Sequence, residues 1–529
     1  MSMMTMRLTL VALVLCGLAF VHAWPRTQKE LDQLPRWDYW QPVAGRPQFT
    51  GRFLASRPGM IHLKKQTFDV ANLFDLDETV NNKLLYGSIL LKPTVVTTAP
   101  LENPAVKAAF EFAIKAMKIS SHGANLSPTP TLVKAVILPL YVTGDNGETE
   151  MVVLHEFQST RRETEFFRSH VTLGTNFYLT IEDLSFQLRH QVGVGLDREH
   201  VHNLFQHTFA PLSPSATQTC DTSDCHAASP PRILSFNVWN TNPSGDVYGQ
   251  SRRWDQYNKR IDHLMSFVKE SRADIVGFQE VRYDGVLANK GQHSQVEHLA
   301  KRLPGFQFVY QAAMSYINDR SPYERIEEGP AIFSKYPIVE TDYLLLSRDP
   351  NDPNDSHQRL CLHAVVDHPQ WGWIDVYATH LSLSERSREQ TMLEIWNYMQ
   401  HGKGVTQVLL GDLNAEPDSR GIQFLRGDAR LDGQTTDLKD AWLEKHMEAA
   451  PRSPDAHDRA HKFTFPSDNP IKRIDFILYR GKGAIKECEI LAQAPTEDTK
   501  DFPTDVGMLN SQSPIYASDH RAVVAEFTA

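Results

Sequence analysis

From Arg232 onward, short apolar runs bounded by turn residues alternate with segments whose apolar residues recur at helical spacing. The runs predict β-strands and the wider spacing predicts helices. The predicted strands are 233–238, 275–278, 306–311, 331–334, 360–366, 374–379, 407–410, 474–478 and 522–527, and the predicted helices are 258–271, 294–303 and 384–400. Strands that alternate with helices are typical of layered α/β proteins.

The pattern is different between residues 24 and 210. Asn103 as N-cap and Pro104 at the first helical position predict one helix. Two β-like runs, 131–142 and 150–157, flank a glycine-containing turn and predict a β-hairpin. We therefore expect an α+β or mostly β domain, whose function the sequence does not indicate.

The N-terminus has the pattern of a targeting segment. Arg7 precedes an apolar run over 8–21, and Ala23 supplies a small residue at the expected cleavage site. The run is shorter than a membrane-spanning helix requires, so we expect a cleaved signal peptide and no stable membrane insertion. This predicts a protein that is secreted or resides in the lumen of the secretory or lysosomal pathway.

A segment rich in Ser, Thr and Pro separates the two patterns and predicts a linker. The expected organisation is a signal peptide (1–23), an N-terminal domain (24–210), the linker (211–231) and a C-terminal catalytic domain (232–529). We make no prediction of the oligomeric state.

Cysteine usage agrees with an oxidising compartment. Of the five cysteines, Cys16 lies in the predicted leader. Cys220 and Cys225 are close enough to close a small disulfide loop, with a zinc site as the weaker interpretation because no second ligand pair accompanies them. Cys361 and Cys488 could pair with each other or remain buried thiols.

Two further features concern the surface of an exported protein. Asn125 and Asn354 lie in glycan acceptor sequons, and Asn354 is the better candidate because a polar loop surrounds it. The net charge of -10, without a dense Lys/Arg block, argues against tight binding of long nucleic acids. It does not exclude a nuclease, because bound cations can supply positive charge locally.

Polar residues stand at the ends of the predicted strands. These residues are Asn237, Glu280, His380, Asp412, Asn414, Asp475, Asp519 and His520. Each alone is compatible with a turn or a salt bridge, because Asp and Asn are common in turns. As a set, their carboxylate and amide oxygens suit Mg²⁺, Mn²⁺ or Ca²⁺ better than zinc.

The order of the motifs adds a family resemblance. The strings are ILSFNVWN, DIVGFQEVR, EEGPAIFSKYPI, VYATHLSLSERSREQ, LLGDLNAEP, RIDFILY and ASDHRAVVAEF. In this order they resemble the motif series of the endonuclease/exonuclease/phosphatase superfamily, which includes the deoxyribonuclease I-like enzymes. The resemblance covers about 232–527 and implies a four-layer α/β sandwich, with two packed mixed β-sheets flanked by helices.

The resemblance also implies a role for each matching residue. Glu280 would be the principal metal ligand, assisted by Asn237 and Asp519. Asp412 would orient and deprotonate the attacking water, and Asn414 would hold the phosphate and that water. His520, oriented by Asp475, would donate hydrogen bonds to the phosphoryl oxygens. His380 would contact the phosphate or help the leaving oxygen depart, and Arg359 would contact the phosphate.

Together these features predict a secreted, divalent-metal-dependent phosphoester hydrolase that uses in-line attack by water. The substrate class stays open between nucleic acid, phospholipid and small phosphoesters. A sphingomyelinase would need an apolar finger, and we interpret its one candidate, Trp371 and Trp373, as a β-hairpin turn with one packed indole. The alternative function is a catalytically inactive extracellular binding or adhesion protein on the same fold.

Overall fold

The computed structural model describes residues 97–98, 114, 131–141, 149–158, 166–174, 178–183, 190–195, 230–239, 257–284, 295–317, 325–349, 351–447, 462–502 and 514–528. The predicted signal peptide, most of the predicted linker, Asn125, Cys220 and Cys225 lie outside these residues, so their predictions stay untested. Within the described residues, no helix is long and apolar enough to cross a membrane.

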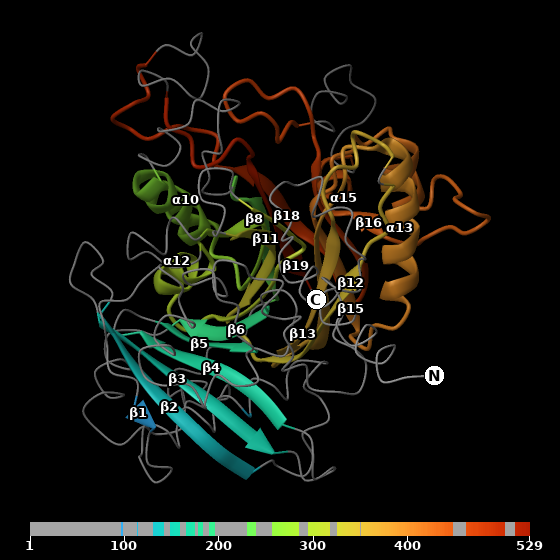
Figure 1. Ribbon diagram of the computed structural model, residues 1–529. Coiled ribbons are helices and arrows are strands. Elements are labelled where there is room, and N and C mark those ends of the chain that lie inside the picture. Colours follow the sequence, from blue (N-terminus) through green and yellow to red (C-terminus); the bar gives the residue numbers. More distant parts are fainter. Residues whose placement is uncertain are drawn as a thin grey trace, which may run out of the picture.

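The first sheet of the C-terminal part is mixed (Figure 1). Its strands are β7 (Arg232–Asn237), β8 (Ile275–Asp284), β9 (Gln307–Gln311), β10 (Met314–Ile317), β11 (Arg325–Ser334), β18 (Ala484–Leu491) and β19 (Ala522–Thr528). They follow the order β9-β11-β8-β7-β19-β18, with β10 beside β11. The β7–β8 pair is parallel and the other pairs are antiparallel.

Strands of the N-terminal part continue this sheet. They are β1 (Thr97–Thr98), β2 (Thr131–Tyr141), β3 (Thr149–Gln158), β4 (Phe166–Gly174), β5 (Tyr178–Asp183) and β6 (His190–Gly195). Each pairs with the next in antiparallel fashion, which confirms the predicted hairpin as β2 and β3. The connection to the C-terminal part is the antiparallel pairing of β6 with β9, which places Val192 opposite Val309.

The second sheet is separate and has six strands in the order β12-β13-β14-β15-β17-β16. These are β12 (Ile338–Leu345), β13 (Leu360–His368), β14 (Gly372–His380), β15 (Thr406–Asp412), β16 (Lys439–Asp440) and β17 (Asp475–Gly481). The helices are α10 (Tyr257–Ser271), α12 (Gln295–Arg302), α13 (Glu385–Met399), α14 (Arg420–Leu425) and α15 (Ala441–Met447).

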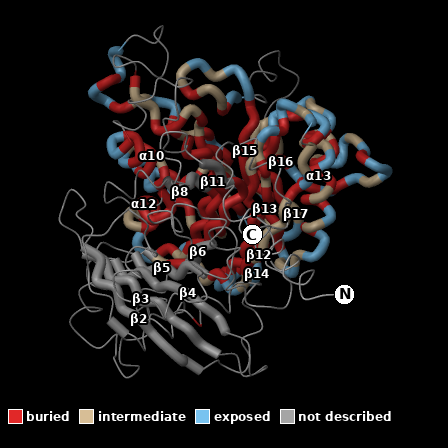
Figure 2. The backbone as a smooth tube through the Cα atoms, in the orientation of Figure 1, coloured by how far each residue is buried: buried red, intermediate tan, exposed pale blue. Residues whose placement is uncertain are grey.

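Three apolar clusters define four layers. One lies between the sheets and joins residues such as Ile332 and Leu410. A second packs α10 and α12 on the first sheet, and a third packs α13 and α14 on the second. The sheets approach so closely that a Cβ added at Gly277 would lie 1.9 Å from the Leu410 side chain. Figure 2 shows this buried interior between exposed outer loops, and the four-layer α/β sandwich is confirmed.

The exposed fractions of individual side chains test three further predictions. Trp371 is 4% exposed and Trp373 is 44% exposed, beside the antiparallel turn that joins β13 and β14. The pair is therefore a hairpin with one packed indole, as predicted.

Cys361 and Cys488 are both free and buried, so of the two possibilities they are buried thiols. Asn354 is exposed on its loop, and its glycosylation stays a prediction.

Candidate active site

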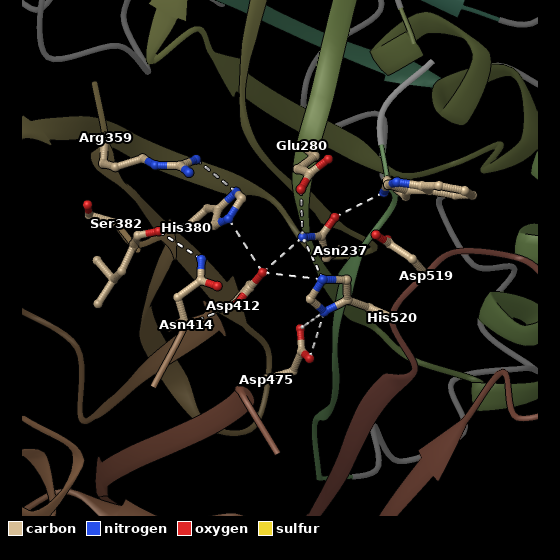
Figure 3. A network of polar contacts seen from close by, with 12 residues as sticks. Asn237, Glu280, Arg359, His380, Ser382, Asp412, Asn414, Asp475, Asp519 and His520 are labelled. Atoms are coloured by element: carbon tan, nitrogen blue, oxygen red, sulfur yellow. Dashed lines mark hydrogen bonds and ion pairs between the residues drawn. The ribbon is translucent and has the colours of Figure 1, made fainter. Parts of the chain in front are cut away.

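Strand register brings three of the predicted residues together on the second sheet. His380 ends β14 and lies opposite Asp412, which ends β15. Asp412 in turn lies opposite Asp475, which begins β17. Across the sandwich, Asn237 ends β7 of the first sheet, and Figure 3 shows it pointing toward Asp412. The site therefore lies where strand ends of both sheets meet.

The Asp412 carboxylate is the centre of this cluster. Its Oδ2 lies 3.0 Å from Nδ2 of Asn237, 3.4 Å from Nε2 of His380 and 3.5 Å from Nε2 of His520. Asp412 is only 2% exposed. Burial raises its pKa to about 7, although the neighbouring His520 acts in the opposite direction. A carboxyl group in this environment can take up a proton near neutral pH.

His520 is held between two carboxylates. Its Nδ1 lies 2.9 Å from Oδ2 and 3.2 Å from Oδ1 of Asp475. Burial acts to lower the pKa of His520, but the charges of Asp475 and Asp412 outweigh it and raise the pKa well above its usual value. Asp475 therefore orients the His520 ring, and the two carboxylates favour its protonated form, which is a hydrogen-bond donor.

The surroundings of His380 shift its pKa in the opposite direction. Its Nδ1 lies 3.0 Å from Nη1 of Arg359, the residue that ends the loop before β13. Burial, and then the positive charge of Arg359, hold the pKa of His380 well below its usual value. The structure places Nη1 of Arg359 on His380, and the expected contact of Arg359 with the phosphate stays a prediction.

Asn414 lies beside Asp412 on a strained turn. Its backbone N–H donates to Oδ1 of Asp412 at 3.0 Å, and its side-chain Nδ2 donates to the Leu381 carbonyl at 2.9 Å. Asn414 has a φ of +48°, a left-handed conformation that is uncommon for residues other than glycine. The turn thus orients the Asp412 carboxylate. The side-chain Oδ1 of Asn414 takes no part in these two contacts.

The predicted metal ligands lie next to this cluster. The register of β8 against β11 shifts between Gly329 and Ala331, and Glu280 at this bulge has a φ of +58°. Its Oε1 accepts from Nδ2 of Asn237 at 3.2 Å. Bulges of this kind re-aim a side chain next to active sites.

Asp519 is tied to the same asparagine through Ser518. Ser518 Oγ donates to the Asn237 carbonyl at 2.6 Å and lies 3.3 Å from Oδ1 of Asp519. In Figure 3, Glu280 lies above Asn237 and Asp519 lies to its right. Two carboxylates and an amide oxygen form a donor set that suits a hard divalent cation.

A second group could hold a metal by distance alone. Ligand atoms of Asp412, Asp475 and His520 lie within 4.8 Å of one another. However, His520 Nδ1 is occupied by Asp475, and a protonated imidazole has no lone pair for a metal. The geometry of this group therefore suits proton chemistry, whereas the oxygens of Glu280 and Asp519 suit a cation.

The Endonuclease/Exonuclease/phosphatase family model matches residues 234–520 of the chain. The chain belongs to this family. Proteins of the endonuclease/exonuclease/phosphatase family are hydrolases that act on phosphoester bonds. No curated protein matches the chain significantly.

Several solved structures of endonuclease/exonuclease/phosphatase proteins are similar to the chain. A family protein from Bacteroides vulgatus is 20% identical, with 57% of this chain and 99% of that chain covered and a TM-score of 0.39. A mannosyl-6-phosphatase from Bacteroides thetaiotaomicron is 18% identical, with 56% and 99% covered and a TM-score of 0.40. The human Nocturnin catalytic domain is 16% identical, with 57% and 93% covered and a TM-score of 0.39.

Sequence reasoning missed two contacts of this endonuclease/exonuclease/phosphatase site. Ser518, in the ASDH string, links Asn237 to Asp519. The Trp239 N–H donates to Oδ1 of Asn237 at 2.9 Å and orients that amide. Ser518 has a signal in the sequence, since it directly precedes Asp519, but a backbone donor such as that of Trp239 has none.

Proposed function

We propose that the chain is a secreted, divalent-metal-dependent phosphoester hydrolase that attacks its substrate in line with water. The observation that carries this proposal is the position of Asp412, which is buried within 3.5 Å of Asn237, His380 and His520. An inert fold would gain nothing from burying a carboxylate among so many polar side chains, since desolvated charges are costly.

In the proposed reaction, Asp412 orients the attacking water and takes its proton. A pKa of about 7 suits a general base, because such a group accepts a proton in the transition state and releases it afterwards. His520, kept cationic by Asp475, donates a hydrogen bond to a non-bridging phosphoryl oxygen as charge develops there. Asn414 holds the phosphate and water through its amide.

Glu280 and Asp519, with Asn237, would hold the cation, which we propose to be Mg²⁺, with Mn²⁺ or Ca²⁺ as substitutes. A cation bound there supplies positive charge to the phosphoryl oxygens of the substrate. The donor set consists of oxygens only, which supports this class of ion.

Secretion is supported by the sequence of the first 23 residues alone. The disulfide between Cys220 and Cys225 and the glycan on Asn354 belong to the same proposal. Mass spectrometry of the protein purified from culture medium tests all of these at once, with a mature N-terminus at Trp24 as the expected result.

The activity itself is tested by incubating the purified protein and Mg²⁺ with DNA, RNA, sphingomyelin and small phosphomonoesters. We expect hydrolysis of at least one class, loss of activity with EDTA and recovery with excess Mg²⁺. Glu280→Gln should need a higher Mg²⁺ concentration, whereas Glu340→Gln, which changes an exposed carboxylate paired with Lys403, should not. Absence of hydrolysis with every metal and substrate would favour the binding or adhesion protein.

A further inference from the structure

The protonation state of His380 follows from the atoms that its ring contacts. Nη1 of Arg359 lies 3.0 Å from His380 Nδ1. A guanidinium has only donors and keeps its protons at any ordinary pH, so Nδ1 must be the acceptor in this contact. The ring proton is then on Nε2, which lies 3.4 Å from Oδ2 of Asp412.

The geometry points to His380 acting as a neutral hydrogen-bond donor through Nε2–H, and not as the general acid that protonates the leaving oxygen. Arg359 is the positioning residue that fixes this form. This inference rests on the proposed function for the reaction in which His380 takes part, but the form of the ring can be measured without any substrate.

The number of protons that the His380 ring can carry supports this role. If Nε2 gave up its proton while Nδ1 carried none, the ring would become an imidazolate anion, which is unstable at neutral pH. Arg359 cannot replace the lost proton through Nδ1, because a guanidinium keeps its protons at any ordinary pH. As the bond from phosphorus to the attacking water forms, the water proton passes to Asp412. The leaving oxygen departs with the electron pair of its bond to phosphorus and takes a proton from solvent water.

Charged and titratable groups face His380 from several elements. His357 and Arg359 face it from the segment before β13, Asp412 faces it from β15, His520 faces it from the segment before β19, and Glu280 and Glu328 line the same small hollow. The side chain of His380 is only 12% exposed, so burial disfavours its charged form. Burial first, and then the charges of Arg359, His520 and His357, keep its pKa well below the usual value.

The first test determines directly which ring nitrogen of His380 carries a proton. In protein labelled with ¹⁵N-histidine, long-range ¹H–¹⁵N spectra distinguish the two ring nitrogens, and His380→Gln identifies the signals of His380. We expect a proton on Nε2, none on Nδ1 and no titration near neutral pH. In Arg359→Met we expect His380 to titrate at a higher pH, while Arg359→Lys, which keeps a cationic donor, should resemble the wild type. A protonated Nδ1 in the wild type would overturn the inference.

The second test separates hydrogen bonding from acid catalysis. His380→Gln keeps a neutral N–H donor and is assayed on one phosphodiester with an aryl leaving group and one with an alkyl leaving group. We expect kcat to fall by a similar factor for both, at most about 100-fold. A much larger loss for the alkyl ester, which needs its leaving oxygen protonated, would contradict the inference.

Kinetics also separate the two possible roles of Arg359. A positioning role predicts that Arg359→Met lowers kcat and leaves KM nearly unchanged, whereas direct phosphate binding would raise KM. If the wild-type protein cleaves no phosphoester, the proposed function fails, but the spectra still decide the form of His380.

Discussion

At the scale of single residues, the polar contacts of the site converge on Asp412, and its two histidine neighbours differ in charge. His520 is paired through Nδ1 with a carboxylate, whereas His380 is paired through Nδ1 with a guanidinium. The different partners shift their pKa values in opposite directions. Environments that separate the pKa values of similar groups commonly assign them different roles in catalysis.

Asp475→Asn tests the role of the His520 partner. Without the charge and hydrogen bond of Asp475, burial lowers the pKa of His520 and favours the neutral ring. We expect kcat at pH 7 to fall by about 10²–10⁴-fold. Lowering the pH should not restore kcat, because the protonation that recharges His520 also protonates the general base Asp412. The measurement is the pH profile of kcat, with exposed Asp437→Asn as the control. A profile like that of the wild type would refute this role.

The two buried thiols give a second residue-scale prediction. Burial raises the pKa of both Cys361 and Cys488, which suppresses the reactive thiolate. We expect neither to be alkylated by iodoacetamide in the native protein and both to be alkylated after unfolding without reductant. Peptide mass spectrometry reads this result, and protection that persists in the unfolded protein would show that the thiols are paired.

Most of the candidate site could be predicted at this scale, because each residue stands in a short motif at a strand end. The partner of Arg359 could not be predicted. Its contact with His380 depends on how the loop before β13 packs, and that loop is fixed by contacts distant in sequence. An example is Asp355 Oδ2, which accepts from Ser387 Oγ of α13 at 2.7 Å.

At the scale of elements, close approach of β14 and β15 places Asp412 beside His380. Gly411 precedes Asp412 with a φ of +151°, and a Cβ there would lie 2.0 Å from the Thr379 carbonyl oxygen. Real Cβ atoms do not approach a backbone oxygen so closely. The glycine is therefore required by the strand pair that carries the site.

Gly411→Ala should lower both stability and activity. Gly433 is a matched control, because it also has a positive φ of +75° but nothing within 4 Å of an added Cβ. We expect Gly433→Ala to cost about 1–2 kcal/mol in the free energy of unfolding. Gly411→Ala should cost about 1–3 kcal/mol more because the strands must separate. Denaturant unfolding measures both, and equal losses would contradict the role given to Gly411.

The elements themselves were predicted unevenly. Strands buried on both faces, such as β13 and β15, are continuous apolar runs and were found within a few residues of their ends. Strands β12 and β18 were missed because each is an edge strand with charged residues among its apolar ones. The short elements α14, β16 and α15 were missed because they contain too few residues to show a period.

At the scale of the whole molecule, the pairing of β6 with β9 joins the N-terminal strands to the catalytic sheet. The linker predicted at 211–231 suggested two independent units, but no pattern in the sequence reveals which strands pair across it. Phe308, Val309 and Tyr310 of β9 are fully buried, so this strand is poorly suited to be an edge.

Truncation tests this connection. A chain beginning at residue 230 lacks β6 and leaves β9 unpaired on one side, whereas a chain beginning at 184 keeps β6 and lacks only β1–β5. We expect the shorter chain to have the lower thermal midpoint and to self-associate during size-exclusion chromatography, because an unpaired apolar edge strand recruits other chains. Equal midpoints and a monomeric shorter chain would show that β6 is dispensable.

The most direct test of the central claim is the hydrolysis rate of a bis-aryl phosphodiester with Mg²⁺, measured for the wild type and for Asp412→Asn. The substitution keeps the size of a side chain that is 2% exposed but removes its ability to take a proton. We expect the variant to lose about 10²–10⁴-fold in kcat while remaining folded. Hydrolysis by Asp412→Asn at the wild-type rate would contradict the assignment of the active site.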